Sequence, residues 1–413
     1  MRQDARKIYT GAIHASLPDS AVSDALKRFT LPEGRLILVA IGKAAYRMAK
    51  RARDIIVDEM CGKIDTGIVI TKYNHREGDI PELEIYEGGH PVPDENCVRA
   101  TERALEITED LNEKDTVLML ISGGGSSLFE CPYCDLSDYI ALTKALLGSG
   151  ADIREINTVR KHLSRVKGGR FAEHIGKARL FTVALSDVLG NRLDTIASGP
   201  TVIDNSTADE ANAIIGKYKI SISEKMREHL SKETPKKLPD ATQIIGGSVS
   251  ELCLAAKAEA EALGYKVYIL TDAEEGEARE VGRRLAAMAL ENQETKTPLA
   301  FIIGGETVVK LKGNGLGGRN QEIALAAAPL IRGKDNIAIF SVGSDGTDGP
   351  TDAAGGYVDG ESYDKMVAVG LSPEGELENN NAYYALKSID GLIMTGPTGT
   401  NVNDFCMALI RVK

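Results

Sequence analysis

The chain has 413 residues, of which 43% are hydrophobic, and it carries a formal net charge of −11 and no Trp. This length provides for two or three domains with full hydrophobic cores. The acidic balance and the scarcity of aromatic residues argue against a general nucleic-acid-binding surface. An anionic ligand would therefore need positive charge that is gathered locally, against the net field of the protein.

The sequence also argues against a membrane protein. Its longest apolar runs, such as "RLILVAIG", are too short to span a bilayer, and the N-terminal residues lack the apolar core of a signal peptide. The six cysteines are scattered, and the single Cys-x-x-Cys motif, from Cys131 to Cys134, has no second pair. Two incidental thiols are therefore favoured over a zinc or redox site. We expect a cytoplasmic protein, since a reducing compartment fits this cysteine usage.

In the first half of the chain, short apolar runs alternate with longer helical patterns, which predicts an α/β domain with a largely parallel sheet. The apolar runs lie, in chain order, at 35–42, 66–71, 83–89, 116–122 and 178–186. Helical patterns lie at 43–60, 136–150 and 157–175, the last of them rich in Lys and Arg.

A domain boundary is predicted in segment 222–243, which is charged and contains proline. After it the alternation starts again, which predicts a second α/β domain. Its apolar and helical patterns lie at 243–264, 265–291, 298–305, 336–346 and 391–397. We expect one domain over residues 1–237 and another over residues 238–413.

Gly-rich turns follow two of the expected strands, and open α/β sheets bind ligands beyond the carboxyl ends of their strands. Lys43 follows Gly42 where a helix begins, and the helix dipole there favours an anion, so a ligand-binding lysine is favoured over a solvated one. The second turn offers consecutive backbone N–H groups to an anion such as phosphate. Its residues are Ser122, Gly123, Gly124, Gly125, Ser126 and Ser127.

Further polar groups stand at the ends of later elements. Most of the basic helix is expected to be a solvated face, although Arg160 or Lys161 could face a ligand. Carboxylates at strand ends suggest Mg²⁺, although aspartates that cap turns give the same pattern. These polar groups are Asp187 after Ser186, the turn Ser198–Thr201, the aspartates Asp345, Asp348 and Asp352, and the hydroxyl-rich loop Thr395–Asp404.

The stretch "GNGLGGRNQE" contains Gly313, Gly315 and Gly318 in the G-x-G-x-x-G spacing of dinucleotide-binding loops. Such a loop should follow a buried parallel strand. The preceding "ETVVKLK" alternates apolar and charged residues, which indicates a half-exposed strand. The ribose-binding acid is also misplaced, because Asp335 precedes an apolar run rather than ending it. We therefore favour a Gly-rich hairpin that leads into a helix near Arg319.

Taken together, these segments resemble one family, the class II glycerate 2-kinases, whose C-terminal part is the MOFRL domain. The shared segments cover nearly the whole chain in one order, which makes the resemblance far more specific than any single motif. They are "IGKAA", "GGHPVPD", "LISGGGSSL", "NTVRKHLSRVKGGR", "LSDV", "SGPT", "GGETVVKLKGNGLGGRNQE", "SVGSDGTDGPTDAAG" and "TGPTGTNVND".

The resemblance implies two α/β domains with largely parallel, Rossmann-like sheets and an active-site cleft between them. It implies phosphorylation of D-glycerate at its 2-hydroxyl by ATP with Mg²⁺, which gives 2-phosphoglycerate and ADP. Family members have also been labelled hydroxypyruvate reductases, so an NAD(P)-dependent reductase is the alternative. A non-catalytic sugar-acid sensor is a third class, and a homo-oligomer is left open.

The site residues that follow from this hypothesis come from both halves of the chain. Lys43 and Arg319 would bind the glycerate carboxylate or the transferring phosphoryl group, because a guanidinium can grip either one with two N–H groups. The Ser122–Ser127 loop would bind the triphosphate. Asp187 would orient or deprotonate the 2-hydroxyl or hold Mg²⁺, and Glu306 and Asp345 are further metal candidates.

Overall fold

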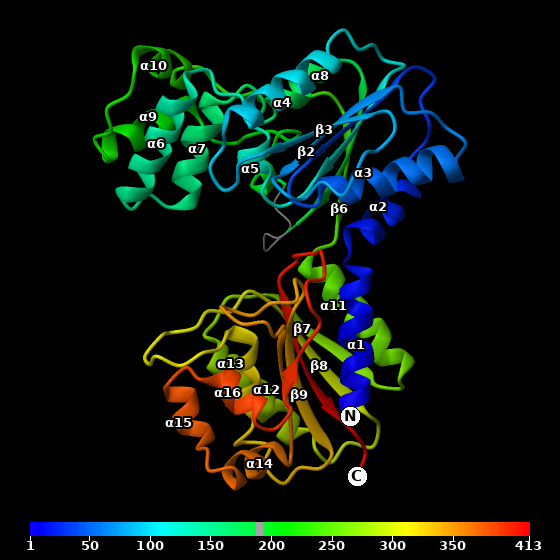
Figure 1. Ribbon diagram of the computed structural model, residues 1–413, viewed down its shortest axis with the longest axis vertical. Helices are drawn as coiled ribbons and strands as arrows, with labels where there is room; N and C mark the ends of the chain where they lie inside the picture. The colour runs from blue at the N-terminus through cyan, green and yellow to red at the C-terminus, as the bar shows by residue number, and fades with distance from the viewer. Residues whose placement is uncertain (187–192) are drawn as a thin grey trace. The chain divides into compact units, whose positions relative to one another are not determined.

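The computed structural model describes residues 1–186 and 193–413. The chain forms two compact units, of which the first is Ala21–Gly246 and the second joins Met1–Ser20 to Gly247–Lys413. We call them the N-terminal and the C-terminal unit. Each unit contains one six-stranded sheet with helices on its faces (Figure 1), which confirms the α/β class.

The sheet of the N-terminal unit is entirely parallel, and its strand order is β3-β2-β1-β4-β5-β6. This is the order of the Rossmann fold. Its central strands are buried on both faces, which is why they appear in the sequence as continuous apolar runs. The strands are β1 (Leu36–Ile41), β2 (Thr66–Lys72), β3 (Leu83–Gly88), β4 (Thr116–Ile121), β5 (Arg179–Leu185) and β6 (Ala241–Gly246).

Helices cover both faces of this sheet, and alternate residues of each strand enter two separate cores. Leu36, Leu38 and Ala40 of β1 pack toward α2 and α3, whereas Ile37 and Val39 pack toward α4 and α8. Helices α6, α7, α9 and α10 form a small cluster of their own. The helices are α2 (Pro18–Leu26), α3 (Ala45–Arg53), α4 (Glu95–Ile107), α5 (Gly125–Leu128), α6 (Leu136–Gly148), α7 (Ile153–Leu163), α8 (Arg170–Ile175), α9 (Ala208–Lys217) and α10 (Glu224–Leu230).

The basic segment 157–175 differs from the sequence prediction in two ways. It is two helices rather than one, because Gly168 and Gly169 take φ angles of +58° and +85° between α7 and α8. It is also not a solvated face, since Lys161 is 7% exposed and Lys167 is fully buried. Their carboxylate partners lie far away in the sequence, so charge patterning along the helix could not reveal them.

The sheet of the C-terminal unit is mixed, with the order β11-β10-β9-β12-β8-β7. Only the pair β7–β8 is parallel, whereas the sequence predicts a largely parallel sheet. The last strand of the chain, β12, inserts antiparallel between β8 and β9, and β10 returns antiparallel beside β9. The strands are β7 (Lys266–Glu274), β8 (Leu299–Gly305), β9 (Ile337–Gly343), β10 (Gly355–Asp359), β11 (Leu392–Ile393) and β12 (Asp404–Ile410).

Helices α1 and α11 lie together on one side of the second sheet, and α12, α13 and α16 lie on the other (Figure 1). Residues Asn320 to Ala327 of α13 are all buried, so this helix is a core element that carries Arg319 at its first position. The helices are α1 (Arg2–Ala15), α11 (Val249–Ala262), α12 (Ala278–Glu291), α13 (Arg319–Ala327), α14 (Ser362–Ala368), α15 (Pro373–Glu378) and α16 (Ala382–Lys387).

The boundaries of the two units differ from those of the expected domains, 1–237 and 238–413. Strand β6 pairs with β5, so residues up to Gly246 belong to the N-terminal unit. The first twenty residues join the C-terminal unit, because Ile8 and Ala12 of α1 are fully buried on the side that packs against α11. Local composition carries no sign of that long-range packing.

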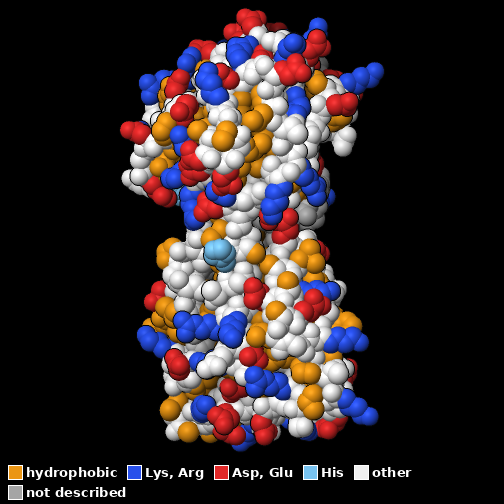
Figure 2. Space-filling view, turned by 90° about the vertical axis from the view of Figure 1, so that its right-hand side faces the viewer, with side chains coloured by type: hydrophobic (Ala, Val, Ile, Leu, Met, Phe, Trp, Pro, Cys, Tyr) orange, Lys and Arg blue, Asp and Glu red, His pale blue; other side chains and the backbone are white. Residues whose placement is uncertain are grey.

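Acidic and basic side chains are interspersed over the face of the molecule shown in Figure 2, over both units. Within the described ranges, every helix is too short or too polar to cross a bilayer. Cys131 and Cys134 are buried free thiols.

Candidate functional site

The first group of candidate residues lies at the centre of the parallel sheet. The strand order reverses between β1 and β4, and ligands of open α/β sheets bind beyond the carboxyl ends of the strands at such a point. Gly42-Lys43 follows β1, and the Ser122–Ser127 loop follows β4. The two turns are bonded to each other: the Lys43 N–H donates to the Gly123 carbonyl at 2.8 Å, and the Ala44 N–H donates to Ser122 Oγ at 3.0 Å.

Glycine is required at position 42 by this contact. Its φ angle is +111°, and a Cβ added there would lie 2.3 Å from Ser122 Oγ. A side chain would therefore meet both backbone strain and a steric clash. The glycine allows the turns after β1 and β4 to touch, which brings Lys43 to the Gly-rich loop.

The loop presents fewer free donors than the sequence suggested. The N–H groups of Gly125 and Ser127 bond to the carbonyls of Ser122 and Gly124. Those of Gly123, Gly124 and Ser126 have no acceptor within the described chain. The Lys43 ammonium likewise has no hydrogen bond or ion pair with any described residue. Three N–H groups and one ammonium at a single turn form a suitable site for an anion.

Two more side chains border this loop. A Cβ on Gly124 would lie 3.1 Å from His90 Nε2 and 3.2 Å from Lys43 Cγ, so the imidazole and the lysine stem flank the same glycine. Burial, and then the charge of Lys43, lower the pKa of His90, which keeps the ring neutral near pH 7. Ser198 Oγ lies 3.0 Å from Ser126 Oγ.

The turn that carries Ser198 is held in an unusual conformation. Ala197 and Ser198 have φ angles of 50° and 60°, in the left-handed region that costs free energy for residues with a side chain. Ala197 packs on Gly125, where an added Cβ would lie 2.7 Å from the Ala197 methyl group. Asp187, the expected base or metal ligand, lies outside the described residues.

The second group of candidate residues surrounds Arg319 in the C-terminal unit. Most of the Arg319 hydrogen-bond donors are already bonded to protein carboxylates and cannot bind a ligand. Its Nε and Nη2 donate to the two carboxylate oxygens of Asp404, and its Nη1 donates to Glu306 Oε1 at 2.8 Å. A guanidinium has five N–H groups, so one on Nη1 and one on Nη2 remain. The side chain is 30% exposed.

Asp404 and Asp348 hold the start of α13 in place. Asp348 accepts the N–H groups of Asn320 at 3.1 Å and Gln321 at 2.8 Å, which caps the helix. Burial raises the pKa of Asp348 to about 7 and that of Asp404 to about 6. From the sequence, Asp348 is expected to be either a Mg²⁺ ligand or a turn-capping residue, and Asp404 is only the end of a hydroxyl-rich loop.

The glycines of "GNGLGGRNQE" serve packing rather than dinucleotide binding. Residues 306–318 form no strand, so the expected half-exposed strand and hairpin are wrong. A Cβ on Gly313 would lie 2.4 Å from Asn379 Oδ1, and one on Gly318 would lie 2.3 Å from Asp348 Cγ. The helix that follows does begin at Arg319. The alternation of apolar and charged residues wrongly predicted a strand, because the segment is instead a loop that crosses a surface formed by Asn379–Asn381.

Among the expected metal ligands, the two that the structure describes, Glu306 and Asp345, do not form a preformed cation site. Among the described residues, no three or more Asp, Glu, His or Cys side chains are grouped so that they could hold a metal. Glu306 pairs with Arg319. Asp345 Oδ1 accepts the Thr347 N–H at 2.9 Å, and a Cβ on Gly343 would lie 3.4 Å from Asp345 Oδ1 and 3.2 Å from Asp404 Oδ1. This donor set suits Mg²⁺ only if phosphate oxygens complete its shell.

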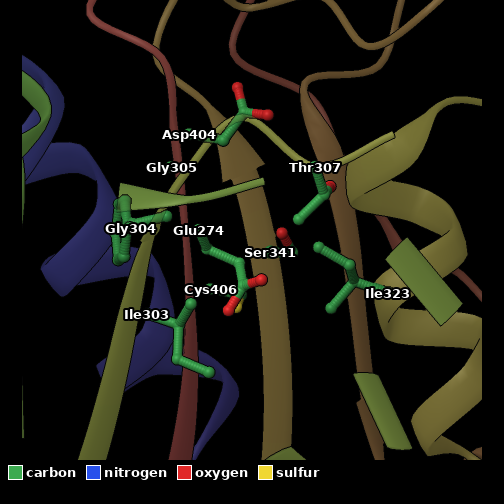
Figure 3. Close-up of a pocket in the computed structure, with 10 residues that line it drawn as sticks. Glu274, Ile303, Gly304, Gly305, Thr307, Ile323, Ser341, Asp404 and Cys406 are labelled. Carbon is green, nitrogen blue, oxygen red and sulfur yellow. The ribbon is translucent and has the colours of Figure 1, made fainter. Parts of the chain in front are cut away.

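A small hollow lies beside Asp404, and Figure 3 shows Thr307 and Ser341 close together in its lining. Its volume is about 190 Å³ even with the open space at its mouth. Pockets that bind small organic ligands are larger, roughly 300–1,000 Å³. The hollow is therefore too small to enclose a nucleotide.

Comparison with known proteins covers both units. Residues 4–231 match the family described as a domain of unknown function, DUF4147, and residues 299–404 match the MOFRL family. A D-glycerate 2-kinase of Thermotoga maritima is 50% identical over 99% of this chain and 98% of its own. A glycerate 2-kinase of Pyrococcus horikoshii is 40% identical over 100% of this chain and 98% of its own.

Some relatives carry a different name. An Agrobacterium vitis protein provisionally named a hydroxypyruvate reductase is 41% identical over 99% of this chain and 94% of its own. The crystal structure of a glycerate kinase from Thermotoga maritima superposes with a TM-score of 0.93 at 50% identity, over 99% of both chains. The matches extend over the Lys43 turn, the Ser122–Ser127 loop and the Arg319 helix. This chain therefore belongs to the class II glycerate 2-kinase family, which joins a DUF4147 domain to a MOFRL domain.

Proposed function

We propose that this protein transfers the γ-phosphoryl group of ATP to the 2-hydroxyl of D-glycerate, which gives 2-phosphoglycerate and ADP. The observation that carries the proposal is the anion site at the end of β1 and β4. There an unpaired lysine and three free N–H groups stand together, among the described residues, in a protein whose net charge is −11. The near full-length similarity to glycerate 2-kinases supports the same activity.

The Ser122–Ser127 loop is proposed to bind phosphate oxygens of ATP through the N–H groups of Gly123, Gly124 and Ser126. Phosphoryl transfer needs little covalent chemistry from the protein, and it depends on positioning and on neutralising charge. Lys43 would supply that charge from beside the loop, since its ammonium has no competing carboxylate among the described residues. Its contribution grows as charge moves to the transferring oxygens.

Arg319 is proposed to bind the glycerate carboxylate with its two remaining N–H groups. Asp404 and Glu306 then act as positioning residues, because they hold the guanidinium plane in one orientation. Arginine suits this task, since it serves two carboxylate partners and still offers donors to a third. Glu306 is assigned here to Arg319 rather than to a metal.

Mg²⁺ is proposed to arrive with the triphosphate, with Asp345 as its protein ligand in the C-terminal unit. When bound, the ion would neutralise charge on phosphate oxygens. Asp187 remains our proposal for the group that orients or deprotonates the 2-hydroxyl. A carboxylate suits that role because it accepts hydrogen bonds from hydroxyl groups when ionised.

The reductase alternative has weaker structural support. The dinucleotide spacing lies in an irregular loop rather than after a strand, and the turn after β1 has only Gly42 where a dinucleotide fingerprint needs three glycines.

The test incubates the protein with D-glycerate and Mg-ATP and follows ADP, and it incubates a second sample with hydroxypyruvate and NADH or NADPH. We expect ADP release that depends on glycerate and no oxidation of the dinucleotide. Hydride transfer without ADP release would establish the reductase instead. Tight glycerate binding with neither reaction would indicate a sensor.

A further inference from the structure

A buried polar network lies directly beneath the Ser122–Ser127 loop in the N-terminal unit. Glu130 and Lys167 are fully buried, and Tyr139 is 1% exposed. The Lys167 ammonium and the Tyr139 hydroxyl both donate to Glu130 Oε2. Arg160, whose side chain is 13% exposed, donates from Nε to the Tyr139 hydroxyl at 2.9 Å.

Two cations of this network also hold the backbone that leaves the loop. Arg160 Nη2 donates to the Ser126 carbonyl at 2.7 Å, and Lys167 Nζ donates to the Phe129 carbonyl at 3.1 Å. Ser126 carries one of the three free N–H groups of the loop. The carbonyl that Arg160 holds belongs to the same residue as that N–H, so Arg160 restrains the backbone torsions next to a donor proposed to bind phosphate.

The network has an excess of positive charge. Arg160 and Lys167 are two cations, Glu130 is one carboxylate, and Glu130 Oε1 is buried without a hydrogen-bond partner among the described residues. One of the two cations therefore lacks an anionic partner within the network, and burying an unpaired charge is costly. Burial, opposed by Glu130 and reinforced by Arg160, lowers the pKa of Lys167 to about 8, so at pH 7 the lysine remains mostly charged. A bound polyanion above the loop would offset that excess.

We propose that Arg160 is a positioning residue of the phosphate-binding loop, held by Tyr139 and Glu130, and that it supplies positive charge beneath the bound phosphate chain. This inference rests on the proposed function, since it assigns the Ser122–Ser127 loop to phosphate. Both the spacing of the guanidinium donors and the positive charge of Arg160 matter for this role. Lysine at this position would keep the charge, but it could not bridge the Tyr139 hydroxyl and the Ser126 carbonyl with two rigidly spaced donors.

The neighbouring residue provides a matched control. Lys161 stands next to Arg160 on α7 and is also buried, at 7% exposure. Its ammonium pairs with Asp204 at 3.2 Å, and no contact links it to the loop in the described structure. Removing either cation from this helix costs stability, but only the removal of Arg160 also removes a contact with the loop.

The experiment measures the affinity of the full-length protein for inorganic tripolyphosphate by titration calorimetry, with no glycerate present. Arg160→Met should weaken binding by about tenfold or more, Arg160→Lys by several-fold, and Lys161→Met by less than about twofold. Tyr139→Phe keeps every charge but removes the hydrogen-bond acceptor of Arg160 Nε, so it should weaken binding by several-fold. In turnover, Arg160→Lys should raise the KM for ATP and leave the KM for glycerate unchanged.

Several results would overturn the inference. Equal losses in Arg160→Met and Lys161→Met would make Arg160 a purely structural residue, and so would unchanged affinity in Arg160→Lys and Tyr139→Phe. If Arg160→Met fails to fold, these two milder variants decide the question. A wild-type protein that does not bind tripolyphosphate would also refute it. Tripolyphosphate binding without glycerate phosphorylation would instead contradict only the proposed function.

Discussion

Replacing Arg319 by lysine tests the proposed substrate contact most sharply, because the structure assigns three of its donors to protein groups. Lysine offers one ammonium where arginine makes two bonds to Asp404 and one to Glu306. It therefore keeps at most part of this pattern and lacks the two remaining N–H groups that are proposed to bind glycerate.

The expected losses of kcat/KM and of Tm follow from the hydrogen bonds that lysine cannot make. Loss of one charge-assisted bond to the glycerate carboxylate, about 1.5–3 kcal/mol, lowers kcat/KM by about tenfold to a hundredfold. Loss of one bond to the buried Asp404 costs a comparable amount of stability, and a shift of Tm by about 3–12 °C follows for a domain of this size. This loss of Tm arises because Asp404 pairs with Arg319 in the folded protein.

The assay is steady-state kinetics at a temperature well below both melting transitions, beside a thermal melt. Arg279→Lys is the matched control, because Arg279 is a buried arginine of the same unit that pairs with Glu322 at 3.0 Å and Glu378 at 3.1 Å. The control should lose a similar amount of Tm and keep kcat/KM within about twofold. Equal activity losses in the two variants, or unchanged kcat/KM in Arg319→Lys, would refute the substrate contact.

Three further predictions concern other residues. Lys43→Ala should lower kcat/KM by about a hundredfold or more and leave Tm almost unchanged, since the ammonium has no partner among the described residues; near-normal kinetics would make Lys43 a bystander. Gly42→Ala should cost about 1–3 kcal/mol or more in a denaturant melt, because it adds a Cβ at φ +111°, whereas Gly148→Ala, with no atom within 4 Å, should be neutral or slightly stabilising. Burial raises the pKa of Asp404 to about 6, so kcat/KM for glycerate should fall as the pH drops through 6 and the carboxyl ceases to pair with Arg319. Because that pKa is raised, the contribution of Asp404 to stability is present at low pH and is lost as the pH rises through 6. Asp404→Asn should flatten both pH dependences, and an unchanged profile in that variant would assign them to another group.

The sequence predicts well those parts of the fold that depend on the local pattern of apolar and polar residues. Strands β1 and β4 are buried on both faces, and such strands appear as uninterrupted apolar runs. Their parallel pairing places Gly42-Lys43 beside the Ser122–Ser127 loop. The anion site could therefore be assembled from the sequence before its geometry was known.

The parts that sequence missed depend on contacts between distant residues. Lys167 was assigned to a solvated face because its partner Glu130 lies 37 residues away, and Arg319 was expected to be free because Asp404 lies 85 residues away. The insertion of β12 between β8 and β9 is likewise a property of the whole chain, so the mixed sheet could not be read from apolar runs alone.

Phosphorylation of glycerate at the 2-hydroxyl and at the 3-hydroxyl gives different isomers, so identifying the product decides between them. D-glycerate and Mg-ATP are incubated with the protein and with enolase, which accepts 2-phosphoglycerate, in the absence of phosphoglycerate mutase. We expect phosphoenolpyruvate to form at the same rate as ADP, and Lys43→Ala to slow both equally. ADP release without phosphoenolpyruvate until mutase is added would mean that the 3-hydroxyl is phosphorylated, and it would contradict phosphorylation at the 2-hydroxyl.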